Sequence, residues 1–127
     1  AGKDPDIIAL SLPPTSHLEI NAIQRASAVI LQKSLREGFG LTVSEALWKR
    51  RAVVASAVGG IPLQVLHEQT GLLVRSVAGT AFQTMRLLDN PILRQELGAE
   101  GRAHVCDNFL HTREVRDYLA VFASLLP

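Results

Sequence analysis

The chain has 127 residues, of which 47% are hydrophobic and 20% are charged. This length favours a single domain, and the composition excludes a disordered tail and a disulfide-rich scaffold. Thirteen Lys and Arg residues against twelve Asp and Glu residues leave a net charge of +1. No strong positive field therefore indicates a nucleic acid or an acidic membrane as a partner.

The single cysteine, Cys106, cannot form an intramolecular disulfide, and this usage is typical of a reducing compartment. Charged residues interrupt every apolar stretch before it reaches the roughly 20 residues that a membrane helix needs. We therefore expect a cytoplasmic protein with no membrane span.

Four short apolar segments predict buried strands. The first ends at Pro13-Pro14, where the backbone can no longer donate ladder hydrogen bonds. Continuous apolar runs of this length suit strands that are covered on both faces, as in parallel sheets. The four predicted strands span residues 6–12, 29–32, 52–56 and 71–74.

Helical patterns separate these strands. Ser16 and Glu19 have the spacing of a capping box, as do Thr42 and Glu45, so each pair predicts the start of a helix. Strands that alternate with helices over short connections are typical of α/β proteins. The sequence thus predicts a Rossmann-like, mostly parallel sheet with helices on both faces.

The C-terminal part, residues 78–126, is predicted to be helical. Asn90-Pro91 has an N-cap residue followed by proline at the first helical position, which marks a helix start. The last helix carries an apolar stripe from Val115 to Leu126 that needs a surface to cover it. We expect Leu119 and Phe122, together with Val115, to pack on the core of the domain.

The stretch from Glu37 to Glu45 carries the most informative chemistry. It places a Gly-Phe-Gly turn between the end of a strand and the start of a helix. In open parallel sheets, ligands bind beyond the carboxyl ends of the strands, and a helix N-terminus there attracts phosphate. The two carboxylates would repel a diphosphate, so they suit sugar hydroxyls on either side of it. Such a ligand is a nucleotide sugar.

Simpler roles remain open for these residues. Glu45 could complete a capping box with Thr42, and Glu37 could be a solvated turn residue. Gly59-Gly60 follows another strand end, so it either faces the same crevice or forms a plain turn. A non-catalytic nucleotide-binding or interaction domain therefore stays open beside an enzyme.

The motifs, in their order, resemble a known family. Glu37–Glu45, Val58–Pro62 and Thr70–Val74 are similar to the donor-binding, C-terminal half of retaining glycosyltransferases with the two-domain GT-B fold. Within that family, segments 21–27 and 31–34 most resemble the trehalose synthase branch, which joins glucose from a nucleotide donor to glucose. The trehalose phosphorylases are the closest alternative.

The resemblance implies roles for individual residues. Glu37 would act at the catalytic centre by contacting donor-sugar hydroxyls, and Glu45 would hold the ribose hydroxyls. The two glycine loops would present their backbone to the donor. The implied donor-binding residues in these loops are Gly38, Phe39, Gly40, Leu41, Thr42, Gly59 and Gly60.

The resemblance also implies what lies outside the chain. Residues 1–127 would form a donor-binding domain fragment whose partner is the missing N-terminal acceptor domain, so we expect no activity from this chain alone. Positive side chains and a helix dipole would replace a metal, so no metal or other cofactor is expected. Two positions depart from the pattern. Gln64 stands where many relatives have Glu, and Arg50-Arg51-Ala52-Val53 stands where many have Gly-x-Pro-Val.

Overall fold

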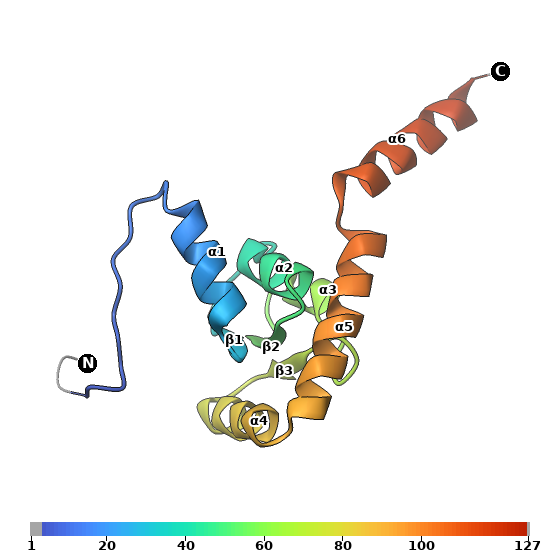
Figure 1. Ribbon diagram of the computed structural model, residues 1–127. Coiled ribbons are helices and arrows are strands. Elements are labelled where there is room, and N and C mark those ends of the chain that lie inside the picture. Colours follow the sequence, from blue (N-terminus) through green and yellow to red (C-terminus); the bar gives the residue numbers. More distant parts are fainter. Residues whose placement is uncertain (1–3, 127) are drawn as a thin grey trace.

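The computed structural model describes residues 4–126. Figure 1 shows a small sheet between helices, with a last helix that projects from the rest. None of the helices in this described part is long and apolar enough to cross a membrane. In chain order the elements are α1 His17–Ala26, β1 Val29–Gln32, α2 Leu41–Trp48, β2 Ala52–Ser56, α3 Ile61–Gln64, β3 Leu72–Val74, α4 Val77–Asp89, α5 Pro91–Asn108 and α6 His111–Leu125.

The three strands form one parallel sheet in the order β1-β2-β3. Val29 lies opposite Ala52 in the first pair, and Val54 lies opposite Leu72 in the second. The central strand β2 is buried along its whole length. The structure thus confirms the predicted parallel α/β sheet and the strands at 29–32 and 52–56, while the strand predicted at 71–74 begins one residue later.

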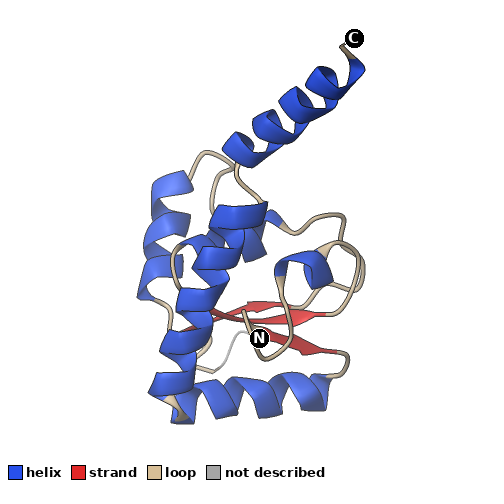
Figure 2. Cartoon of the chain, turned by 90° about the vertical axis from the view of Figure 1, so that its right-hand side faces the viewer, coloured by secondary structure: helices blue, strands red, loops and turns tan. Residues whose placement is uncertain are grey.

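Helices cover both faces of the sheet, as predicted (Figure 2). On one face Val53 and Ala55 pack against α2, α3 and the C-terminal half of α5. On the other face Ala52 and Val54 pack against α4 and the N-terminal half of α5. The alternation follows from the strand geometry, in which successive side chains point to opposite faces.

The predicted strand at 6–12 is wrong for the described structure. This segment is extended but exposed, and its side chains include Ile8 at 78% exposure and Leu10 at 61%. Figure 1 shows it running apart from the sheet, so no neighbour supplies the ladder hydrogen bonds that make a strand. The outer edge of β1 is open, and Leu31 on that strand is 48% exposed.

The predicted packing of the last helix on the core is also wrong. No residue of α6 is buried, and Val115, Leu119 and Phe122 are 56%, 62% and 60% exposed. The stripe has the predicted helical spacing, but α6 projects away from the sheet and its covering helices (Figure 1). The helix start at Asn90-Pro91 is confirmed, because the Asn90 side chain accepts a hydrogen bond from the N–H of Leu93 at 3.0 Å.

The C-terminal end of α2 closes on Arg50 in a left-handed conformation, with φ at 58°. The N–H of Arg50 donates to Leu47 at 2.9 Å, and the N–H of Arg51 donates to Ala46 at 3.0 Å. This is the pattern of a Schellman motif, in which glycine is the usual residue. Here Arg50 takes that position, and the glycine lies opposite it, at Gly98 on α5. A Cβ on Gly98 would lie 2.4 Å from the Arg50 carbonyl oxygen.

Candidate functional site

The two glycine loops touch each other. The N–H of Gly60 donates to the carbonyl of Gly38 at 2.6 Å. Gly59 has φ at 54°, and a Cβ built on it would lie only 1.7 Å from the Glu37 carbonyl oxygen. Glycine at this position therefore permits a backbone contact that no other residue allows. The structure brings together the loops that follow β1 and β2.

Helix α2 begins directly after this contact. Gly40 is its N-cap residue, with φ at 87° and no side chain to cap the helix. Leu41 and Thr42 form the first turn, and both side chains are exposed. The first turn of any helix has N–H groups without intrahelical acceptors, and it carries the positive end of the helix dipole. These groups can hold an anion that reaches the glycine loops.

Neither predicted capping box forms. Thr42 lies inside α2 because the left-handed Gly40 takes the N-cap position, so Glu45 is not its capping partner. Ser16 is the N-cap residue of α1, but its side chain makes no capping hydrogen bond. The simple capping role for Glu45 is therefore excluded.

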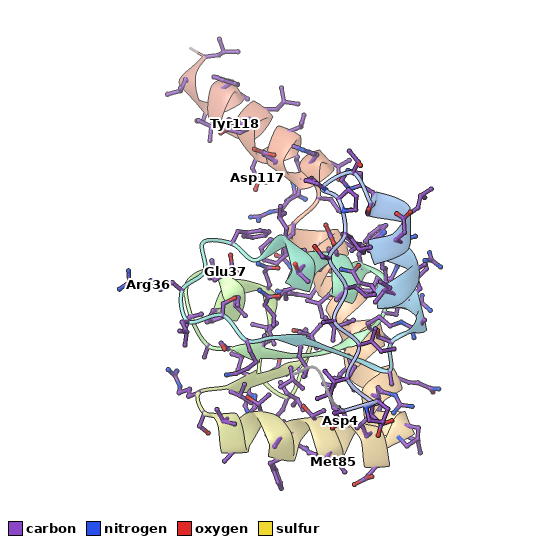
Figure 3. The ribbon with its side chains drawn as sticks, turned by 90° about the vertical axis from the view of Figure 1, so that its left-hand side faces the viewer. Asp4, Arg36, Glu37, Met85, Asp117 and Tyr118 are labelled. Atoms are coloured by element: carbon purple, nitrogen blue, oxygen red, sulfur yellow. The ribbon has the colours of Figure 1, made fainter. Side chains whose placement is uncertain are left out.

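Glu37 is half-buried and held by two neighbours. Its Oε2 accepts hydrogen bonds from the Ser34 hydroxyl at 3.0 Å and from the Gln32 amide at 3.3 Å. Figure 3 shows the adjacent Arg36 side chain pointing away from the molecule. Within residues 4–126 no donor reaches the other carboxylate oxygen, so Glu37 is an oriented acceptor rather than a free turn residue.

Glu45 borders a polar pocket between α1 and α2. Its Oε2 accepts a hydrogen bond from Gln24 at 3.1 Å, and the carbonyl oxygen of the same Gln24 amide accepts from Lys49 at 2.6 Å. Gln24 is only 5% exposed, so this chain of contacts fixes the carboxylate in place. The pocket has a volume of about 380 Å³ and is lined by His17, Ile20, Asn21, Gln24, Thr42, Glu45 and Lys49.

Gln64 on α3 links the glycine loop that follows β1 to helix α2. Its amide nitrogen donates to the carbonyl of Phe39, and its amide oxygen accepts from the hydroxyl of Ser44 on α2. The Phe39 ring in turn packs against Phe109 at the end of α5, with the ring centroids 5.6 Å apart. The conformation of the glycine loop is thus set by contacts from α2, α3 and α5.

All nine residues proposed for the site lie in the two touching loops or on α2. The sequence did not predict the side-chain roles of Gln24 and Gln64. Each bonds to a group more than 20 residues away along the chain, which local spacing does not reveal. The one available signal was that Gln64 stands where many relatives have Glu.

The fold defines a parallel α/β domain with two glycine loops at its strand ends, and comparison with known proteins identifies its family. The chain belongs to the family of glycosyl transferases group 1, whose model matches residues 12–104. Its structural neighbours are GT-B glycosyltransferases. Sucrose-phosphate synthase from Thermosynechococcus elongatus superposes with a TM-score of 0.71 at 33% identity, over 80% of this chain and 27% of that one.

Within this family the sequence is similar to trehalose synthases and, at lower identity, to trehalose phosphorylases. The trehalose synthase of Rubrobacter xylanophilus is 49% identical over 127 residues, which is 99% of this chain and 30% of that protein. The trehalose phosphorylase of Pleurotus pulmonarius is 38% identical over 107 residues, which is 80% of this chain and 14% of that protein. The chain therefore spans about 30% of the length of the trehalose synthase that it matches.

Proposed function

We propose that this chain is the nucleotide-sugar-binding part of a retaining glycosyltransferase. The enzyme transfers glucose from a nucleoside-diphosphate glucose to a second glucose, and the product is trehalose. One observation carries the proposal. Two glycine loops touch beside a pair of oriented carboxylates, in a chain that is 49% identical to a trehalose synthase over nearly its whole length.

The parts of the donor match the parts of the site. The diphosphate lies at the N-terminus of α2, where the Gly40, Leu41 and Thr42 backbone offers N–H groups and the helix dipole. Glu45, held by Gln24 in the polar pocket, accepts hydrogen bonds from the ribose hydroxyls. Glu37 has a free carboxylate oxygen for a hydroxyl of the donor sugar. This arrangement needs no metal, which extraction with a chelator tests directly.

A trehalose phosphorylase of the same family is the second candidate, because such a relative is 38% identical over 107 residues. The two activities differ in the glucosyl donor. A synthase uses a nucleoside-diphosphate glucose, whereas a phosphorylase uses phosphate to release glucose 1-phosphate from trehalose. Supplying each pair of substrates to a full-length protein that carries this chain separates them. A non-catalytic domain turns over neither pair.

The proposal assigns the acceptor to an N-terminal domain outside this chain. Retaining transfer requires an acceptor held close to the donor carbon, so the 127-residue chain alone is expected to form no product. Incubating it with nucleoside-diphosphate glucose and glucose tests this expectation. Trehalose appearing well above background would show that the chain carries its own acceptor site.

Exchanging the two carboxylates for amides tests the assigned roles. In a full-length protein carrying this chain, Glu45→Gln loses a charged acceptor for the ribose. Both the nucleoside diphosphate and its glucose ester should then bind about 1–3 kcal/mol more weakly, or roughly 5- to 150-fold. Glu37→Gln should weaken only the glucose ester. Calorimetry with both ligands measures the four affinities.

Glu100→Gln provides the matched control, because Glu100 is exposed on α5 and its exchange removes one negative charge away from the loops. Its affinities should equal those of the wild type. Equal losses for both ligands in both Glu37→Gln and Glu45→Gln would show that the assigned roles of the two glutamates are wrong.

A further inference from the structure

We infer that Gln64 is a positioning residue, whose amide fixes the direction of the Phe39–Gly40 peptide and thereby aims the Gly40 N–H at the donor. The inference rests on the proposed function and adds to it a residue that never touches the ligand. Gln64 has no exposed surface, so its effect on the ligand must pass through the loop.

The chemistry of the neighbours forces the orientation of the Gln64 amide. The Phe39 carbonyl oxygen can only accept a hydrogen bond, so the atom facing it must be the amide nitrogen. The amide oxygen is then left to face the Ser44 hydroxyl, which donates to it. Both ends of the side chain are therefore used, and turning the amide over would place two acceptors against each other.

A trans peptide carries its carbonyl oxygen and its N–H on opposite sides. Because the Phe39 carbonyl points at Gln64, the Gly40 N–H of the same peptide points away from it. No residue in the range 4–126 accepts a hydrogen bond from this N–H. A Cβ on Gly40 would lie 3.7 Å from the Gln64 amide nitrogen and 3.2 Å from Ile61, so α3 supports the inner side of the loop.

In this chain the amide supplies the proton for the Phe39 carbonyl, and an ionised carboxylate at the same position has none to donate. In Gln64→Glu the charged side chain would face the Phe39 carbonyl, and repulsion would turn the peptide and redirect the Gly40 N–H. A protonated carboxyl group would restore the donor. Burial raises the pKa of a carboxyl group, so protonation of this variant falls within an accessible pH range.

Thr70 offers a matched control for the loss of a buried hydrogen bond. Its hydroxyl accepts from the N–H of Leu66 at 2.8 Å and donates to the backbone carbonyl of Gln64 at 3.4 Å. Thr70 is 4% exposed, and it bonds to the backbone of Gln64 and not to the side-chain amide. Thr70→Val removes the hydroxyl with little change in shape and leaves the Gln64 amide in place.

The test uses a full-length protein that carries this chain, with a nucleoside diphosphate and its glucose ester as probes. Gln64→Leu should bind both probes about tenfold more weakly, whereas Thr70→Val should lower the melting midpoint and bind both as the wild type does. Gln64→Glu should bind weakly near pH 8 and approach wild-type affinity as the pH falls to about 5.5. Gln64→Leu should show no such recovery.

Affinities are compared with the wild type at each pH, because Glu37 beside the loop and His104, whose Nε2 lies 2.9 Å from the Leu63 carbonyl, are present in every variant. Wild-type affinity in Gln64→Leu, with only a lower melting midpoint, would overturn the inference while the proposed function stands. If Gln64→Leu does not fold, a pH-independent affinity of Gln64→Glu overturns it. A wild type that binds neither probe refutes the proposed function, and the inference with it.

Discussion

Gly59→Ala tests whether contact between the two glycine loops shapes the donor site. The new Cβ would lie 1.7 Å from the Glu37 carbonyl oxygen and 2.7 Å from its carbonyl carbon, so the loop after β1 must move. Overpacking of this kind costs about 1–3 kcal/mol. The left-handed backbone, with φ at 54°, adds roughly 1–2 kcal/mol for a residue with a side chain. We therefore expect the free energy of unfolding to fall by about 2–5 kcal/mol.

Urea unfolding measures the stability, and calorimetry with a nucleoside-diphosphate glucose measures the site. Gly38→Ala is the matched control, because a Cβ on Gly38 meets nothing within 4 Å and its φ is not positive. Its free energy of unfolding should stay within about 0.5 kcal/mol of the wild type. Gly59→Ala should also lose donor affinity, since Glu37 is displaced. Wild-type stability and affinity in Gly59→Ala would refute the loop geometry.

Three further changes follow from the fold. Arg50→Gly should stabilise the chain by about 1 kcal/mol in urea unfolding, because glycine adopts the left-handed end of α2 without strain, and a loss of stability would refute this helix ending. Phe122→Ala should change the unfolding free energy of this chain by less than about 0.5 kcal/mol, since the ring is 60% exposed. A large loss of stability would show that α6 packs on the core. Arg86 lies 2.6 Å from Glu68 and lowers the pKa of that carboxyl group, first through its hydrogen bond and then through its charge. In Arg86→Gln the pKa of Glu68 should therefore rise in an NMR titration. The lowered pKa of Glu68 favours the folded state at pH values above the unfolded-state pKa. Any stability advantage of the wild type over Arg86→Gln should therefore disappear as the pH falls through the folded-state pKa. An unchanged titration curve would show that the pair does not form in solution.

The buried parts of the fold could be predicted from local patterns. The strands at 29–32 and 52–56 have the predicted bounds, because each is an apolar run between turn residues and the central one is covered on both faces. The cap at Asn90 was predictable for a similar reason, since its partner Leu93 is three residues away. Such features depend on neighbours in the sequence, which a pattern records.

In the candidate site too, the features that depend on sequence neighbours were predicted, and those that depend on packing were not. Glycine at positions 59 and 60 predicted a loop at a strand end, and the structure brings it against the loop from Glu37. The bonds from Gln24 to Glu45 and from Gln64 to Phe39 were not predicted. They depend on how α1 and α3 pack against α2, and a glutamine in a short helix gives no sign of which group its amide will meet.

Two of the wrong predictions, the buried strand at 6–12 and the packing of α6, share a physical cause. The segment 6–12 and the stripe of α6 both have the apolar spacing of buried elements, yet Ile8 is 78% exposed and Leu125 is 74% exposed. Periodicity reports that a face is suited to burial and does not identify the surface that covers it. The open edge of β1 and the projecting α6 are thus surfaces that no element within residues 4–126 covers. Under the proposed function, the acceptor domain would cover α6. Phe122→Ala should then be nearly silent in this chain and should cost about 3–5 kcal/mol in the full-length enzyme, where the ring would be buried. Equal and small effects in both proteins would show that α6 remains exposed and that the apolar stripe serves another contact.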